Sequence, residues 1–156
     1  MEDKFSLNAH NKDEFPPAHT AEHLLNQTMI RMFGCERSTN AHVERKKSKI
    51  SYILNHKPSR HEEKEIEKRM NELIEEDLPV TYEFVSRNNV PAGISLERLP
   101  DDASETLRLV RIGDYDVCPC IGKHVRSTSQ IGRFELLGTN WDEEKHSFRI
   151  RFKVVQ

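Results

Sequence analysis

The helix signal that begins at Ser59 constrains the fold more than any other feature of this sequence. Ser59 is followed three residues later by Glu62, and the two form a capping box, in which each side chain satisfies a backbone amide at the helix start. Apolar residues then recur at helical spacing: Ile66, Met70, Leu73 and Ile74. Pro79 ends the pattern, so the sequence predicts an amphipathic helix that packs on a core.

A second helix is predicted from Ala18 to Phe33. Pro16 and Pro17 set up its start, because proline lacks the amide hydrogen that the first helical turn leaves unused. The apolar stripe of this helix comprises Leu25, Met29, Met32 and Phe33. Gly34 follows and is well placed to end the helix.

Much of the remaining chain alternates apolar and polar residues, which is typical of strands. The apolar positions of these segments are Ala41 and Val43; Ile50, Tyr52 and Leu54; Val80, Tyr82 and Phe84; and Phe148, Ile150, Phe152 and Val154. Glu44–Ser48 should form a hairpin turn, and Leu107–Ile112 and Ile131–Leu137 also read as strands. Asn88–Ala103 is ambiguous, and Asp116–Gln130 shows no period, which predicts irregular structure.

Helices and strands do not alternate as they would around a parallel nucleotide-binding sheet. We therefore predict an α+β fold, with a mostly antiparallel sheet packed against two main helices. A length of 156 residues suits a single domain, 1–156, with its own core. Residues 1–17 are mostly polar and are predicted to form an N-terminal arm or an edge strand.

Composition narrows the setting in which the chain works. No apolar run is long enough for a signal peptide or a membrane span, and Cys35, Cys118 and Cys120 are an odd number of cysteines. A cytoplasmic protein with reduced thiols and no membrane partner is therefore expected. The net charge of −2 argues against nonspecific coating of nucleic acid, and no DNA partner is predicted. The sequence leaves the oligomeric state unknown.

Two local basic clusters contrast with this overall charge. Lys46, Lys47 and Lys49 form the first, and Arg149, Arg151 and Lys153 form the second. Each cluster could contact phosphates or could simply be solvated surface, and the sequence leaves both interpretations open.

His19 and His23 lie four residues apart on the first predicted helix, which places both imidazoles on one face, where they can share a metal ion. The pair alone is a weak signal, since the chain has eight histidines. A zinc protease would carry a glutamate directly after the first histidine, but Thr20 stands there. Metalloprotease chemistry is therefore disfavoured. Glu22 could orient a metal ligand, although a solvated position on the helix is the simpler interpretation.

Cys120 and His124 form a second pair with the same spacing, far along the chain in the aperiodic segment. A thiolate and three imidazoles suit zinc better than magnesium or calcium. We therefore predict a zinc site of His19, His23, Cys120 and His124. Cys118 is separated from Cys120 by one residue, which is not the spacing of redox motifs, so we interpret it as structural or as a neighbour of the ligands. Cys35 is interpreted as a core residue.

The order and spacing of these pairs resemble a known family. His19–His23 resembles an H-x-x-x-H helix, Cys120–His124 a C-x-x-x-H loop, and Thr128–Phe134, with Ile131 and Gly132 inside, the segment that follows that loop. These motifs are those of the editing domain shared by alanyl- and threonyl-tRNA synthetases. The sequence is most similar to the small free-standing alanyl-tRNA editing proteins, the AlaX group.

The resemblance implies a trans-editing hydrolase that removes serine, with glycine as an alternative, from tRNA charged for alanine. It implies the 3′ end of aminoacylated tRNA as partner and no ATP-dependent ligase activity. A hydroxyl from Ser38 or Thr39 would read the amino-acid side chain, although Ala41 is an alternative match to the family's threonine position. Lys123 and Arg126 would contact phosphates of the terminal adenosine, or they are plain surface charge.

His19, His23 and His124 are predicted to be catalytic through the metal, which would orient the substrate or activate a water molecule. A closed tetrahedral site would leave no position for that water, and His124 is the ligand that we expect to be loosest. The alternative is a non-catalytic, zinc-stabilised module that binds tRNA or another partner. A zinc hydrolase for a small molecule is a third interpretation, but it would need a deeper apolar pocket than this polar composition suggests.

Overall fold

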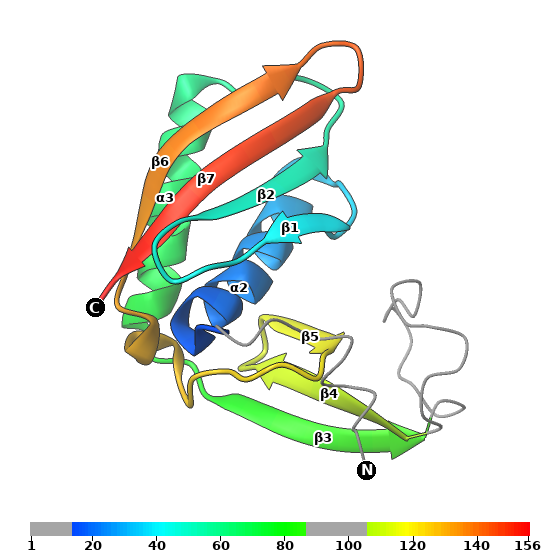
Figure 1. Cartoon of the computed structure of the whole chain (residues 1–156), viewed down its shortest axis with the longest axis vertical. Helices are drawn as coiled ribbons and strands as arrows, with labels where there is room; N and C mark the ends of the chain where they lie inside the picture. The colour runs from blue at the N-terminus through cyan, green and yellow to red at the C-terminus, as the bar shows by residue number, and fades with distance from the viewer. Residues whose placement is uncertain (1–13, 87–105) are drawn as a thin grey trace.

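The computed structural model describes residues 14–86 and 106–156 and has an α+β architecture, as predicted (Figure 1). Most of the predicted N-terminal arm (1–17) lies outside the described residues, and so does the ambiguous segment Asn88–Ala103. The first described helix begins at Pro16, inside the range predicted for the arm. No helix within the described ranges is both long and apolar enough to cross a membrane.

The helices begin and end at the residues that the sequence marks. Helix α2, Pro16–Phe33, starts with its two prolines and ends at Gly34, whose backbone is left-handed with φ of 67°. Helix α3, Arg60–Glu75, starts at the capping box: the Ser59 hydroxyl accepts a hydrogen bond from the Glu62 amide at 3.1 Å. The Glu62 carboxylate accepts one from the Ser59 amide at 2.8 Å. Both predicted helices are therefore confirmed.

Four strands form one antiparallel sheet in the order β1-β2-β7-β6. They are β1 Asn40–His42, β2 Ser48–Ile53, β6 Arg133–Asp142 and β7 Ser147–Val155. The predicted hairpin is present, with Ala41 opposite Ile50. Figure 1 shows α2 and α3 on one face of this sheet. On the other face, Lys49, Ile53 and Arg149 are exposed.

The remaining three strands form a separate antiparallel sheet in the order β3-β4-β5. They are β3 Val80–Ser86, β4 Thr106–Ile112 and β5 Asp116–Pro119. The prediction of irregular structure over Asp116–Gln130 was wrong for its first residues, because β5 pairs with β4 from Asp116 opposite Ile112 to Pro119 opposite Leu109. A strand as short as β5 has too few residues to show an alternation of apolar and polar side chains. The 3-10 helix η2, Thr128–Ile131, follows the loop after β5.

Helix α2 lies at the centre of the core and contacts both β7 and β5. Its Leu24, Leu25 and Met29 are fully buried, and they pack in one cluster with side chains from the inner face of the four-stranded sheet. Truncating such a leucine to alanine costs about 2–5 kcal/mol. Helix α2 is therefore anchored in the core, and His19 and His23 lie on it just before these residues.

Strand β3 departs from the expected burial. Its alternation predicted a strand correctly, but only Val80 is buried, whereas Tyr82 is 43% exposed and Phe84 is 70% exposed. Tyr82 instead carries the guanidinium of Arg108, whose central carbon lies 4.6 Å from the ring centre. The alternation of residues thus predicted the strand conformation correctly, but it did not predict that Tyr82 and Phe84 would be exposed.

Candidate metal centre

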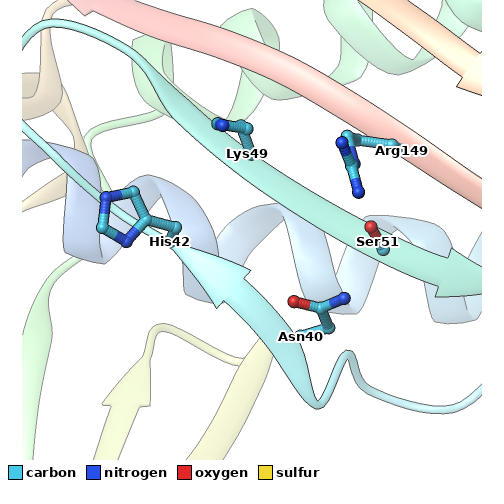
Figure 2. A pocket seen from close by; sticks show the side chains of 5 residues that line it. All are labelled: Asn40, His42, Lys49, Ser51 and Arg149. Carbon is cyan, nitrogen blue, oxygen red and sulfur yellow. The ribbon is translucent and has the colours of Figure 1, made fainter.

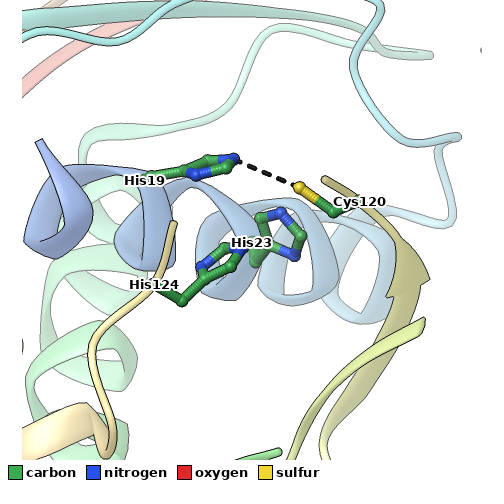
Figure 3. A group of neighbouring side chains, drawn as sticks. All are labelled: His19, His23, Cys120 and His124. Atoms are coloured by element: carbon green, nitrogen blue, oxygen red, sulfur yellow. Dashed lines mark hydrogen bonds between the residues drawn. The ribbon is translucent and has the colours of Figure 1, made fainter. Parts of the chain in front are cut away.

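The structure brings His19, His23, Cys120 and His124 together at the start of α2 (Figure 3). One potential ligand atom from each lies within 4.8 Å of the others. The His19 Nε2 atom is 3.5 Å from the Cys120 sulfur. The His124 ring stacks on His19 with centroids 4.2 Å apart and meets His23 edge-on at 4.4 Å. Three imidazoles and one thiol therefore converge on a single point.

Helix α2 positions the first pair through regular geometry. His19 and His23 are one turn apart, so their side chains lie on the same face of the helix. His23 is buried, while His19 is half-buried toward the loop that carries the second pair.

Polar contacts from several segments hold the loop that carries Cys120 and His124. The Arg108 guanidinium donates hydrogen bonds to the carbonyl oxygens of Cys120, at 2.8 Å, and Gly122. The Lys123 amide donates to the Glu14 carboxylate at 2.8 Å, and the Val125 amide donates to the Thr20 hydroxyl at 3.2 Å. These contacts satisfy backbone groups in a segment that lacks regular secondary structure.

At Gly122 the loop passes close to the start of α2. A Cβ atom at this residue would lie 2.2 Å from the His19 ring and 2.5 Å from the Glu14 carboxylate. Any side chain would therefore push the loop off the first pair, so the approach depends on glycine.

Two of the three imidazoles have a hydrogen-bond partner at Nδ1. His19 Nδ1 is 3.0 Å from the Lys123 carbonyl oxygen, and His124 Nδ1 is 2.9 Å from the Thr20 hydroxyl. His23 Nδ1 lies 3.8 Å from the Asp116 carboxylate. Partners of this kind fix the ring orientation and the tautomer of a metal-bound histidine, leaving Nε2 as the ligand atom.

Asp116 is itself held firmly. Arg37 donates two hydrogen bonds to its carboxylate, at 2.7 and 3.0 Å, and the Gln27 side chain donates one at 2.9 Å. The Asp116 side chain is fully buried, and the Arg37 guanidinium compensates its charge. The three hydrogen bonds fix the position of the carboxylate.

The electrostatics of the cluster fit a bound cation. Burial opposes a proton on His19, but the hydrogen bond and charge of Cys120 overcome it and raise the pKa of His19 to about 9. Burial, together with the charge on His19, lowers the pKa of His124 to about 2, so this ring is neutral. The His124 Nε2 atom is buried and has no hydrogen-bond partner among residues 14–86 and 106–156. An orphaned nitrogen beside a thiol–imidazole pair is a donor set that suits zinc.

Comparison with known proteins identifies the domain. Residues 107–151, from β4 into β7, match the family model described as the threonyl and alanyl tRNA synthetase second additional domain. An alanine–tRNA ligase from Methanococcus vannielii is 34% identical over 139 residues, which are 87% of this chain and 16% of the ligase. The alanyl-tRNA editing protein AlaX-L from Pyrococcus horikoshii is 30% identical over 134 residues, 86% of this chain and 32% of that protein. The chain is AlaX-like in sequence over most of its length. It thus spans less than a third of the editing protein and a smaller share of the ligase.

The side chains of the other predicted site residues lie outside the His/Cys cluster. Ser38 is buried, and its hydroxyl contacts the carbonyl oxygens of Ser51, at 2.6 Å, and Asn40, at 3.1 Å. Thr39 is exposed at the entry to β1. In the ranges that the structure describes, no hydrogen bond links either residue to the His/Cys cluster. Lys123 and Arg126 extend their side chains into solvent, and the Lys123 backbone contributes the carbonyl oxygen that His19 contacts.

The structure also bears on the interpretations of Glu22, Cys118 and Cys35. Glu22 is only 7% exposed and its carboxylate lies 3.8 Å from His19 Nε2, so a solvated position on the helix was wrong. Cys118 is buried on β5, and Cys35 is half-buried against the core cluster, as interpreted.

Sequence reasoning missed the residues that hold the AlaX-like cluster in place: Thr20, Arg108 and Asp116. Thr20 was noted only as the residue that stands where a protease would have glutamate. Arg108 lies between two buried leucines in an alternating strand, so the pattern marks it only as facing the other side. Asp116 belongs to the strand that periodicity did not reveal. Their partners are distant in sequence, so no local pattern could have found them.

Proposed function

We propose that this chain is a zinc-dependent deacylase that hydrolyses the ester of a mischarged tRNA in trans. The proposed substrate is serine on tRNA for alanine, with glycine as a second substrate. The observation that carries the proposal is the convergence of His19, His23, Cys120 and His124 in a domain related to alanyl-tRNA editing proteins. The proposed metal ligands are these four side chains.

The residues around the cluster divide into proposed roles. Zinc, when bound, supplies a Lewis acid that polarises the ester carbonyl or lowers the pKa of a water molecule toward neutrality. Thr20 and the Lys123 carbonyl oxygen orient His124 and His19, and Asp116 faces His23. These contacts fix the histidine rings before substrate arrives, so no reorganisation is needed during the reaction.

Recognition of the substrate is proposed for the exposed residues near the loop and β1. Lys123 and Arg126 carry exposed positive side chains that can contact the phosphates of the terminal nucleotides. The Ser38 hydroxyl already contacts two backbone carbonyl oxygens, at 2.6 and 3.1 Å. Thr39 is therefore the better placed of the two hydroxyls to read an amino-acid side chain.

The test is deacylation of Ser-tRNA, Gly-tRNA and Ala-tRNA, all made with tRNA for alanine. Wild-type protein is compared with His19→Ala and with His61→Ala, which removes an exposed histidine from α3. We expect wild type and His61→Ala to release serine and His19→Ala to be inactive. A chelator should abolish the activity and added zinc should restore it. Survival of all three esters in the presence of zinc would contradict the proposal for this tRNA.

A further inference from the structure

The two basic clusters of the sequence meet on the solvent side of the four-stranded sheet. Strands β2 and β7 are neighbours, and Lys49 lies directly opposite Arg151, while Ser51 lies opposite Arg149. Strand β1 adds His42 opposite Lys49 and Asn40 opposite Ser51. We call these six residues the outer basic face. The residues of β7 that alternate with Arg149 and Arg151 are buried, so one side of this strand packs in the core and the other carries the basic residues.

Positive charge on the outer basic face is only partly compensated. Lys49 and Arg151 occupy directly opposite backbone positions, but the Arg151 guanidinium lies beside Gly138 on β6, the neighbour of β7 on the side away from β2. His42 pairs with Glu44 from the turn, and Arg151 donates to the Asn140 side chain. Within 14–86 and 106–156, Lys49 and Arg149 form no ion pair with a carboxylate. A bound anion would compensate the charges of Lys49 and Arg149.

The outer basic face is also hollowed. Asn40, His42, Lys49, Ser51 and Arg149 line a shallow pocket, and their side chains surround it (Figure 2). Two cationic groups, an amide and a hydroxyl thus face one space. Charged groups of this kind neutralise phosphates, and amides and hydroxyls donate to phosphate oxygens or to the 2′-hydroxyls of RNA.

The turn that joins β1 to β2 links this face to the metal centre. The Arg45 guanidinium lies 4.3 Å from the centre of the Phe15 ring, at the start of α2. Glu14, the residue before Phe15, accepts the hydrogen bond from the Lys123 amide in the metal-site loop. Lys46 and Lys47 are exposed in the same turn. Basic side chains therefore extend from the start of α2 onto the outer face.

We propose that the outer basic face binds the sugar–phosphate backbone of RNA, here the body of the tRNA whose 3′ end reaches the metal centre. The choice of tRNA rests on the proposed function, whereas the chemistry of the face rests on its residues alone. The chain carries a net charge of −2, so its surface as a whole does not attract polyanions, and this face is a local exception.

The experiment measures binding of uncharged tRNA for alanine by fluorescence anisotropy over a series of salt concentrations. Wild type is compared with the double variant Lys49→Gln/Arg149→Gln. The matched control, Lys64→Gln/Lys68→Gln, also removes two positive charges, from exposed positions on α3 across the sheet. We expect the outer-face variant to bind on the order of tenfold more weakly and to lower the salt slope by about one to two. The control should bind as wild type does, and thermal melting should show all three proteins folded.

Equal losses in the two double variants, or less than a twofold loss in the outer-face variant, would overturn the proposal. Because the probe is uncharged tRNA, the measurement does not depend on ester hydrolysis. A wild-type protein that binds tRNA through this face but hydrolyses no ester would refute only the deacylase. One that hydrolyses the ester with unchanged binding in the outer-face variant would refute only the RNA face.

Discussion

The two halves of the candidate metal centre have the same spacing but different origins. His19 and His23 lie four residues apart on α2, where backbone hydrogen bonds of the helix set their relative position. Cys120 and His124 are also four residues apart, but the segment between them is a loop without helix or strand. Their positions depend on Arg108, Glu14 and Thr20, which come from other parts of the chain.

The comparison shows that two side chains four residues apart can be brought together in two physically different ways. A helix places its i and i+4 side chains together whatever surrounds it, provided that the helix forms. A loop places them only where outside groups satisfy its backbone amides and carbonyls. The helix half should therefore tolerate changes around it, whereas the loop half should respond to substitutions far from it in sequence.

Removing Cys120 should have the largest effect. Cys120→Ala deletes the only thiol in the cluster, and we expect loss of bound zinc and a fall in activity on the order of a thousandfold. Far-ultraviolet circular dichroism should stay unchanged, because α2, α3 and the four-stranded sheet have their own core. Cys118→Ala, at the neighbouring thiol, should keep its metal. Unfolding of Cys120→Ala would instead indicate the alternative, a structural zinc clamp.

Loss of the main anchor of the loop should weaken metal binding next most strongly. Arg108→Met keeps much of the side-chain volume but removes the donors to the Cys120 and Gly122 carbonyl oxygens. Zinc affinity, measured by competition with a chromophoric chelator, should fall about 10- to 100-fold. Arg111→Met, on the same strand, removes only an exposed pair with Glu83 and serves as the control. Equal zinc affinity in the two variants would show that the loop keeps its conformation without the Arg108 hydrogen bonds.

Thr20 tests the contact between the two halves. Thr20→Val preserves shape but removes the hydroxyl that contacts His124 Nδ1 and accepts from the Val125 amide. We expect zinc affinity to fall about tenfold. Thr28→Val, two turns along α2, removes a buried hydroxyl that bonds to Leu24 and Tyr115, and it should cost about 1 kcal/mol of stability without changing zinc affinity. The reverse outcome would place the control of His124 elsewhere.

The smallest effect on the protein is expected from a change at the capping box of α3, which is not part of the loop that carries Cys120 and His124. Ser59→Ala removes the oxygen that accepts from the Glu62 amide and should lower the free energy of unfolding by about 1 kcal/mol in urea titrations. Zinc affinity should not change. A measurable loss of zinc would show that the two regions are coupled.

The other half of the capping box gives this prediction a pH dependence. The Ser59 amide donates to the Glu62 carboxylate and lowers the pKa of Glu62 below its ordinary value of 4.5. A depressed carboxylate pKa stabilises the fold above the ordinary value, and that stabilisation is lost as the pH falls through the lowered value. The stability difference between wild type and Glu62→Ala should therefore shrink between pH 6 and about pH 3. A constant difference would contradict this origin.

Sequence reasoning located the elements well where one local cause sufficed. The capping box at Ser59, the prolines at the start of α2 and Gly34 at its end act within a few residues, and each helix begins or ends beside them. The strands with clear alternation were also found. Strand β5 was missed because its hydrogen bonds to β4, not its own residues, make it a strand.

The sequence by itself determined the two helices, most of the strands and the four residues of the candidate metal cluster, because spacing and residue type carry that information. Tertiary structure decided the rest. It divided the strands into two sheets, brought Arg108, Thr20 and Asp116 to the cluster, and joined Lys49 to Arg149 and Arg151 on one face. The physical reason is that these contacts join residues far apart in the chain, and only packing around α2 fixes which distant groups meet.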